Sequence, residues 1–185
     1  MSAAGLLRFA YYAWFSKPAG ERVLYRAISR HRLRRIVEIG LDRGLRAERM
    51  IWAAQRKGKD SVRYTGIDLF ETRVSGAEPL ALKQTYHRLR STGARVQLAP
   101  GDPFTALARI ANTLTGTDLL VISRSPDVDA ESLERSWFYI PRMLHAGSQV
   151  FVEEASEKGT AFRRLAQVEI ERLTAKVQRG HRRAA

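Results

Sequence analysis

Two carboxylates, Glu38 and Asp68, stand near the ends of two short apolar segments. The first segment, residues 36–40, leads into a turn bounded by Gly40 and Gly44, and the second covers residues 64–69. An amphipathic helix is expected between them, over residues 45–57. Strand, helix and strand in this order form a βαβ unit, and open parallel sheets bind ligands outside the carboxyl ends of their strands. We therefore expect both acids beside a ligand site.

Asp102 is a third candidate acid, in the segment Pro100-Gly101-Asp102-Pro103. It could bind a ligand, or it could be an ordinary helix N-cap, because Asp followed by Pro is typical of a helix start. Asp68 could likewise cap a helix or loop, and Glu38 could bind a neighbouring backbone amide. The glycines of the first turn contribute no side chain, but they permit the turn and a close approach of the backbone to a ligand.

These segments resemble the nucleotide-binding segments of class I S-adenosylmethionine (SAM)-dependent methyltransferases, most closely the small O-methyltransferase-like group. The resemblance covers residues 20–155 and departs from the family in its opening Glu/Asp-x-Gly-x-Gly-x-Gly. Asp42 stands at the middle glycine, and Arg46 stands where a further glycine could stand. A dinucleotide-binding motif fits worse, because Asp42 and Leu45 occupy its second and third glycine positions, and a Walker loop is absent from the sequence.

The resemblance implies that SAM is the cofactor and that an oxygen or nitrogen of a small or anionic acceptor receives the methyl group. It implies that Asp68 binds the ribose hydroxyls and that Asp102 receives the adenine amine. Glu38 would either orient the glycine turn or bind the ammonium group of the ligand. The residues expected to bind the cofactor are Glu38, Gly40, Asp42, Gly44, Asp68, Leu69, Gly101, Asp102 and Ser123.

The sequence indicates neither a metal site nor a general base. Metal-dependent relatives carry an Ile-Asp-x-Asp-type segment after the fourth strand, whose acids hold a divalent cation. Here Ser123 and Ser125 replace those acids and Arg124 adds a positive charge, so no metal is expected there. The nearby acids could form a displaced metal site, or they could cap helices and loops at the surface. These acids are Asp127, Asp129, Glu153 and Glu154. Methyl transfer needs no general base when the acceptor is already nucleophilic, because proximity alone can then suffice.

The alternation of strand and helix patterns predicts a three-layer α/β sandwich of the Rossmann-like methyltransferase type, with a five-stranded, mainly parallel sheet. By resemblance, the strand order is 3-2-1-4-5. We expect a helical arm over residues 1–30, the Rossmann-like domain over 31–180 and a basic tail over 181–185. The remaining strands are expected at 95–99, 118–123 and 149–153, and helices at 6–15, 16–28, 79–92, from 103, from 129, and after 154.

The last of these strands has consequences for assembly. About 30 residues follow it, and they leave room for one helix with a stripe at Ala166, Ile170, Leu173 and Val177 but not for the terminal hairpin of the family. The fifth strand would then be an unpaired edge, which predicts a homodimer.

Charge and composition limit the function classes. The 185 residues carry a net charge of +13, which favours phosphates or an anionic membrane as partners, although a solvated basic face is the alternative. A non-catalytic module that binds nucleic acid, an acidic protein or a membrane surface is therefore the rival function. Arg124 favours that rival or an anionic acceptor, because guanidinium suits phosphate and carboxylate.

The absence of cysteine excludes thiol chemistry and disulfides and is compatible with a reducing cytoplasm. The apolar run of residues 9–15 is too short to span a bilayer. Its aromatic side chains could form a lid, a membrane-facing patch or a packing arm, and these are Tyr11, Tyr12, Trp14 and Phe15.

Overall fold

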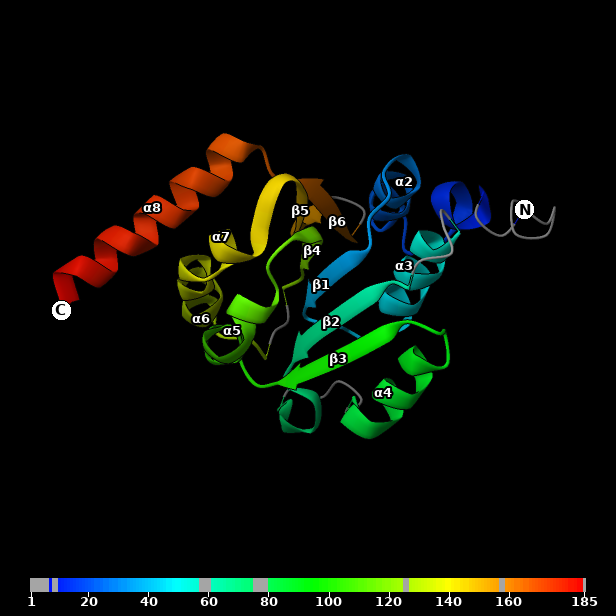
Figure 1. Ribbon diagram of the computed structural model, residues 1–185, viewed down its shortest axis with the longest axis horizontal. Helices are drawn as coiled ribbons and strands as arrows, with labels where there is room; N and C mark the ends of the chain where they lie inside the picture. Colours follow the sequence, from blue (N-terminus) through cyan, green and yellow to red (C-terminus); the bar gives the residue numbers. More distant parts are fainter. Residues whose placement is uncertain are drawn as a thin grey trace.

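The fold is a three-layer α/β sandwich around one six-stranded sheet (Figure 1). The computed structural model describes residues 7, 10–56, 61–74, 80–124, 127–156 and 159–184, with side chains up to residue 180. The strand order is β3-β2-β1-β4-β5-β6; the first five strands are parallel, and β6 is antiparallel to β5. The strands are β1 (Arg35–Ile39), β2 (Arg63–Asp68), β3 (Arg95–Pro100), β4 (Thr117–Ile122), β5 (Leu144–Ser156) and β6 (Gly159–Arg164).

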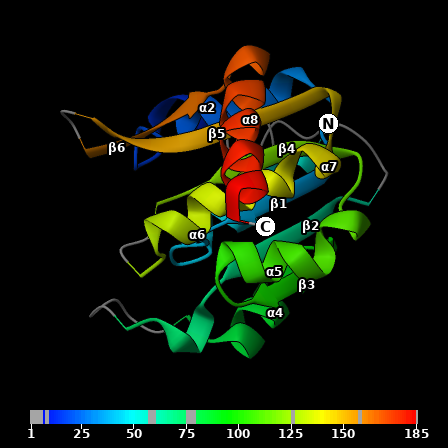
Figure 2. The ribbon, with the colours of Figure 1, turned by 90° about the vertical axis from the view of Figure 1, so that its left-hand side faces the viewer.

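Helices cover both faces of the sheet (Figures 1 and 2). One face carries α2 (Arg22–Arg30), α3 (Leu45–Gln55) and α4 (Leu82–Arg90). The other carries α5 (Pro103–Ile110), α6 (Ala130–Arg135), α7 (Ile140–Met143) and the long α8 (Gln167–Ala184). Short helical turns complete the chain: η1 (Tyr11–Phe15), η2 (Phe70–Thr72), η3 (Ala111–Thr113) and η4 (Ser136–Phe138).

Each face of the sheet has its own hydrophobic core, as expected for parallel strands that are covered on both sides. The central strands β1, β2 and β4 are almost entirely buried. The predicted stripe of α3 is confirmed, since Ala47, Met50, Ile51 and Ala54 are all buried. In α8, Ile170, Leu173 and Val177 pack on the opposite core as predicted, whereas Ala166 precedes the helix and is exposed.

The predicted order 3-2-1-4-5 is confirmed, but the expectation of five strands without a terminal hairpin is wrong. Strand β5 is 13 residues long and continues past the predicted end at residue 153. The chain then returns as β6, which begins at Gly159 with φ of 111° and pairs with β5 from Ser156 back to Phe151. The edge that was expected to be open is therefore paired, and the argument for a homodimer loses its premise. Dimerisation itself stays a prediction.

The N-terminal arm packs against α3 and β6. Helix α2 begins at Arg22, later than predicted, because Ser16 does not cap it; the Ser16 hydroxyl donates to the Tyr12 carbonyl oxygen at 2.7 Å. Gly20 forms a parallel bridge with Ala161 of β6, and a Cβ atom at this position would overlap the Thr160 carbonyl. The arm therefore closes one side of the sheet end.

Some predicted boundaries fall outside the described residues, namely the helix end at Lys57, the helix start at Pro79, and Ser125. Within the described part of the chain, no helix is long and apolar enough to cross a membrane.

Candidate functional site

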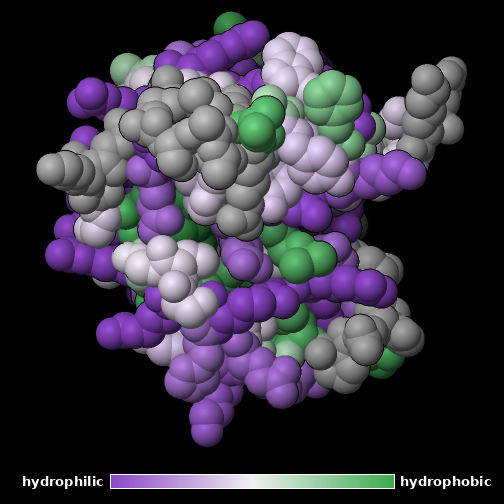
Figure 3. Space-filling view, turned by 90° about the vertical axis from the view of Figure 1, so that its right-hand side faces the viewer, coloured by the Kyte–Doolittle hydropathy of each residue, from purple (hydrophilic) through white to green (hydrophobic). Residues whose placement is uncertain are grey.

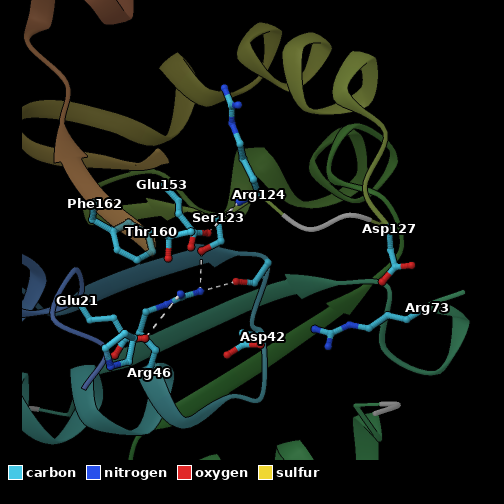
Figure 4. A pocket seen from close by; sticks show the side chains of 12 residues that line it. Glu21, Asp42, Arg46, Arg73, Ser123, Arg124, Asp127, Glu153, Thr160 and Phe162 are labelled. Atoms are coloured by element: carbon cyan, nitrogen blue, oxygen red, sulfur yellow. Dashed lines mark hydrogen bonds and ion pairs between the residues drawn. The ribbon is translucent and has the colours of Figure 1, made fainter. Parts of the chain in front are cut away.

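A pocket lies at the carboxyl ends of β1, β2 and β4, where parallel sheets bind their ligands (Figure 4). We call it the carboxyl-end pocket. Its cavity volume is about 180 Å³. Of the residues that the structure describes, four acids and three arginines line it, namely Glu21, Asp42, Asp127 and Glu153 with Arg46, Arg73 and Arg124, together with Pro18, Gly40, Ser123, Thr160 and Phe162. The lining is therefore net acidic, although the chain as a whole is strongly basic.

The turn between β1 and α3 forms the floor of this pocket. Gly40, Asp42 and Gly44 have positive φ values of 80°, 51° and 72°. A Cβ atom at Gly40 would lie 3.1 Å from both Cβ and the carbonyl oxygen of Ser123, so position 40 needs glycine for its space as well as its backbone. Aspartate tolerates the left-handed conformation better than most residues, which explains how Asp42 replaces a glycine here.

Arg46 fills the space beneath the turn and is almost fully buried, with 5% of its side chain exposed. Its Nε donates to Glu38 Oε1 at 2.7 Å, and its Nη2 donates to the Gly40 carbonyl oxygen at 2.7 Å and to Ser123 Oγ at 2.6 Å. The guanidinium also lies 4.9 Å from the centre of the Phe162 ring. Arg46 thus joins the ends of β1 and β4 to β6.

Burial and charge act against each other in this network: burial raises the pKa of Glu38, although Arg46 and Tyr64 act to lower it. Burial acts to lower the pKa of Arg46, but the neighbouring charges of Glu38 and Glu21 outweigh it and raise this pKa above its ordinary value. The Tyr64 hydroxyl donates to Glu38 Oε2, and burial together with the Glu38 charge raises the pKa of Tyr64. Both oxygens of the fully buried Glu38 are therefore bonded within the protein, and Glu38 lies below the pocket lining.

Asp68 is also bonded to the protein on both oxygens. Its Oδ2 accepts from the Leu41 amide at 2.6 Å and from Arg73 Nη2 at 2.6 Å. Its Oδ1 accepts from the Phe70 amide at 3.1 Å and from Arg73 Nε at 2.8 Å. Hydrogen bonds from Arg73 to Asp68 raise the pKa of Arg73, and the nearby charges of Asp42 and Asp127 act in the same direction. Arg73, and not Asp68, faces the pocket.

The nine predicted cofactor residues fall into three groups. Gly40, Asp42 and Ser123 line the carboxyl-end pocket. Glu38 and Asp68 lie behind it and contact it through Arg46 and Arg73. The remaining predicted residues are not part of its lining, and these are Gly44, Leu69, Gly101 and Asp102.

Asp102 has the geometry of a helix cap. Its Oδ1 accepts from the Thr105 amide at 3.1 Å at the start of α5 and from the Ser132 hydroxyl at 2.6 Å on α6. Hydrogen bonds therefore tie this carboxylate to two helices.

Nine described lining residues were not among the predicted set, and three of them illustrate how their sequence signals differ. Arg73 follows Asp68 by five residues, a short spacing that local reasoning could have examined. Glu21 and Phe162 reach the pocket from the N-terminal arm and from β6, and both elements are far in sequence from the glycine turn. No local pattern indicates them.

The acids considered for a displaced metal site have separate roles. Glu153 Oε2 accepts from the Arg124 amide at 3.1 Å, and Asp127 Oδ1 accepts from the Val74 amide at 3.1 Å. Asp129 caps α6 through the Ser132 amide at 3.2 Å, and Glu154 pairs with Arg163 at 2.9 Å. Among the described residues, no three His, Asp or Glu side chains come together as a group that could hold a metal ion.

Three solved structures with a similar architecture are methyltransferases. The O-methyltransferase TomG from Streptomyces achromogenes, involved in tomaymycin synthesis and solved with SAM, has a TM-score of 0.53 and 18% identity, covering 84% of this chain and 67% of that one. A TehB-like SAM-dependent methyltransferase from Corynebacterium glutamicum has a TM-score of 0.51 and 16% identity, covering 94% and 79%. A SAM-dependent methyltransferase from Agrobacterium tumefaciens has a TM-score of 0.53 and 11% identity, covering 85% and 48%.

This chain has the class I methyltransferase fold. No protein-family model matches the sequence, and a search of curated proteins finds no match. The likeness therefore lies in the methyltransferase fold, and the pocket at its strand ends must carry the argument for function.

Proposed function

We propose that this protein is a SAM-dependent methyltransferase that binds SAM in the carboxyl-end pocket and methylates an oxygen or nitrogen of a small or anionic acceptor. The observation that carries the proposal is the net acidic lining of this pocket in a chain of net charge +13. SAM carries a sulfonium and an ammonium charge against one carboxylate, so it is a net cation. An acidic cavity in a basic protein attracts a cation that the remaining surface repels.

The side chains suit this ligand, whereas the cavity volume requires a rearrangement. Asp68 supplies a carboxylate at the end of β2 that could accept hydrogen bonds from two ribose hydroxyls. Ligand pockets commonly measure about 300 to 1,000 Å³, and the carboxyl-end pocket measures about 180 Å³. Movement of Arg73 away from Asp68 would both enlarge the cavity and free the carboxylate.

In this arrangement the residues of the chain bind and orient the cofactor and the acceptor. When bound, SAM supplies an electrophilic methyl group. Arg46 holds the Gly40 carbonyl and Ser123 Oγ in fixed positions beneath the ligand site. The acids Asp42 and Glu153 provide negative charge on the pocket wall. No histidine of the described part of the chain lines this pocket, and orientation and proximity are the contributions expected from the protein.

Calorimetric titration with SAM and with S-adenosylhomocysteine (SAH) at moderate salt tests the proposal. We expect both to bind and SAM to bind more tightly, because only SAM keeps the sulfonium charge. Asp68→Ala should weaken binding by about 1.5 to 3 kcal/mol, the range for a hydrogen bond to a charged group.

Asp118→Ala is the matched control. Asp118 stands at the opposite end of the sheet and also accepts from two backbone amides, those of Arg34 and Arg35, at 2.7 and 2.8 Å. The control should keep the wild-type affinity, with folding of each variant checked by thermal melting. A folded wild-type protein that binds neither SAM nor SAH would overturn the proposal.

A non-catalytic role on an anionic membrane surface is the second candidate. The η1 segment exposes three aromatic side chains, with Tyr11 54%, Trp14 56% and Phe15 69% exposed. The Arg26 guanidinium lies 5.3 Å from the centre of the Trp14 ring. Figure 3 shows this side of the molecule, where pale and green side chains lie among strongly hydrophilic ones. Exposed aromatics beside basic residues are typical of contact with the interface of an anionic bilayer.

Sedimentation with lipid vesicles tests the second candidate. We expect binding to vesicles of phosphatidylcholine and phosphatidylglycerol in equal parts, no binding to phosphatidylcholine alone, and a loss in the double variant Trp14→Ala, Phe15→Ala. Equal sedimentation of wild type and variant would remove the aromatic segment from the interface. A random oligonucleotide that competes fully would instead indicate a polyanion surface for nucleic acid.

A further inference from the structure

A second cavity adjoins the carboxyl-end pocket and lies between α6 and α8. We call it the α6–α8 groove. Its volume is about 420 Å³, and its lining includes Arg124, Leu133, Glu134, Trp137, Leu173 and Lys176. This volume falls in the range of about 300 to 1,000 Å³ that is common for small-molecule sites.

Arg124 belongs to the lining of both cavities. It follows the end of β4, where its backbone amide donates to Glu153. Figure 4 shows its side chain reaching away from Arg46 and Asp42. Arg46 and Arg73 bind acids within the protein, whereas the Arg124 guanidinium has no hydrogen bond or ion pair with any described residue. Among the described residues, Arg124 is therefore a cation without an acidic partner at the junction of the two cavities.

Apart from Arg124, one side of the groove is mainly apolar, and the charged side chains on the other side form an ion pair. Trp137 is 6% exposed and, with the half-buried Leu133 and Leu173, forms an apolar wall. Lys176 Nζ pairs with Glu134 Oε1 at 2.7 Å, so these two charges cancel locally. A ligand that matches this lining has an apolar or aromatic body and one anionic group directed at Arg124.

We propose that the α6–α8 groove binds the methyl acceptor and that this acceptor is a small carboxylic acid with an aromatic or apolar body. This inference rests on the proposed methyltransferase function and adds the class of substrate. The planar guanidinium of Arg124 can bind a carboxylate through two parallel hydrogen bonds, which holds the acid at the mouth of the carboxyl-end pocket.

A carboxylate as methyl acceptor is consistent with the side chains that line the two cavities. No histidine whose side chain the structure describes lines either cavity, and a carboxylate oxygen is nucleophilic without removal of a proton. Transfer to it forms one C–O bond and breaks the S–CH₃ bond of the donor, with the electron pair retained on sulfur. The products are a methyl ester and SAH, and the step needs no general base.

Binding of matched acids and amides tests the inference without any turnover. Protein saturated with SAH is titrated with 3-phenylpropionate, indole-3-acetate and hexanoate, and with the primary amide of each, by saturation-transfer NMR. We expect at least one acid to bind about tenfold or more tightly than its amide, as expected for a charge-assisted hydrogen bond. Arg124→Gln should abolish this preference, with SAH saturation of the variant verified separately.

Arg135→Gln is the matched control, because Arg135 is an exposed arginine of α6 outside the groove lining and its change removes the same charge. The control should keep the acid preference. Equal binding of acids and amides, a preference that survives in Arg124→Gln, or no binding of any acid to SAH-saturated protein would each overturn the inference. Failure of SAH itself to bind would overturn the proposed function instead, so the two failures are distinguishable.

Discussion

The guanidinium of Arg73 holds both oxygens of the Asp68 carboxylate, with Nη2 2.6 Å from Oδ2 and Nε 2.8 Å from Oδ1. The Leu41 and Phe70 amides donate to the same two oxygens. A carboxylate has about four lone-pair positions, and four donors already use them. A ligand hydroxyl can therefore bind Asp68 only after Arg73 has moved, and Arg73 competes directly with the proposed cofactor.

Replacing Arg73 should consequently improve cofactor binding. We expect Arg73→Ala to raise the affinity for SAH by about tenfold, which is about 1.4 kcal/mol and close to the value of one hydrogen bond to a charged group. Calorimetric titration measures the change. Arg63→Ala is the control, because it removes the same charge from the amino end of the same strand β2. A lower affinity in Arg73→Ala would mean that Arg73 contacts the ligand and does not block it.

Removing Arg46 should destabilise the fold strongly, because it leaves the carboxyl group of Glu38 buried without its partner. Loss of one member of a buried ion pair costs about 3 to 5 kcal/mol, so we expect a fall of this size in the unfolding free energy of Arg46→Met. The double variant Glu38→Gln, Arg46→Met should lose clearly less. Urea denaturation measures all three proteins.

Arg49→Met provides the comparison for the Arg46 experiment. Arg49 has 24% of its side chain exposed and pairs with Glu21 at 3.4 Å. A partly exposed pair contributes about 1 kcal/mol or less. Equal losses of unfolding free energy in Arg46→Met and Arg49→Met would show that the buried network around Glu38 stabilises the fold no more than a partly exposed ion pair does.

The sequence predicts the central sheet well because its strands carry their own signal. β4 contains the continuous apolar run of residues 119–122, and β1 is apolar apart from Arg35 and Glu38. Both strands are almost entirely buried and turn residues bound them, so their positions follow from local patterns. β6 lacks such a signal. Its sequence, Gly159-Thr160-Ala161-Phe162-Arg163-Arg164, is half polar, and pairing with β5 determines its conformation. Short edge strands of this kind depend on their neighbours more than on their own composition.

The sequence predicts a ligand site beside the acids at the strand ends, and the structure has a pocket there, because parallel strands bring their carboxyl ends together. Binding of the cofactor by these residues stays a prediction. The partners of those acids are set by tertiary structure. Arg46 was noted only as a departure from a glycine pattern, and nothing in a linear reading indicates that it neutralises Glu38. The contact between Arg73 and Asp68 depends on the η2 turn, where Phe70 has φ of 51°.

The pKa of Asp102 predicts a specific pH dependence of stability. Burial acts to raise this pKa, but hydrogen bonds from Ser132 and Thr105 outweigh it, and the folded-state pKa lies below the ordinary value of about 3.9. A carboxyl group whose pKa is lowered by folding stabilises the fold at pH values above its ordinary pKa. This stabilisation is lost as the pH falls through the folded-state pKa.

Asp102→Asn isolates this effect, because asparagine is also a good N-cap but does not titrate. The difference in unfolding free energy between wild type and Asp102→Asn should be constant above about pH 5 and should shrink below about pH 4. Urea denaturation at several pH values measures it. A difference that stays constant or grows toward acid would show that the hydrogen bonds to Asp102 do not favour its charged form.

Magnesium and manganese should not bind at the end of β4. Ser123 stands where metal-dependent relatives carry an acid, and its Oγ accepts a hydrogen bond from the Arg46 guanidinium at 2.6 Å. The guanidinium beside Ser123 is unfavourable for a divalent cation, and two acids of the pocket lining, Asp127 and Glu153, already accept from backbone amides. Titration of MgCl₂ or MnCl₂ into the protein should give no saturable heat, and excess chelator should leave SAH binding and any methyl transfer unchanged. Saturable binding that disappears in Glu153→Gln would contradict this and place a metal beside the carboxyl-end pocket.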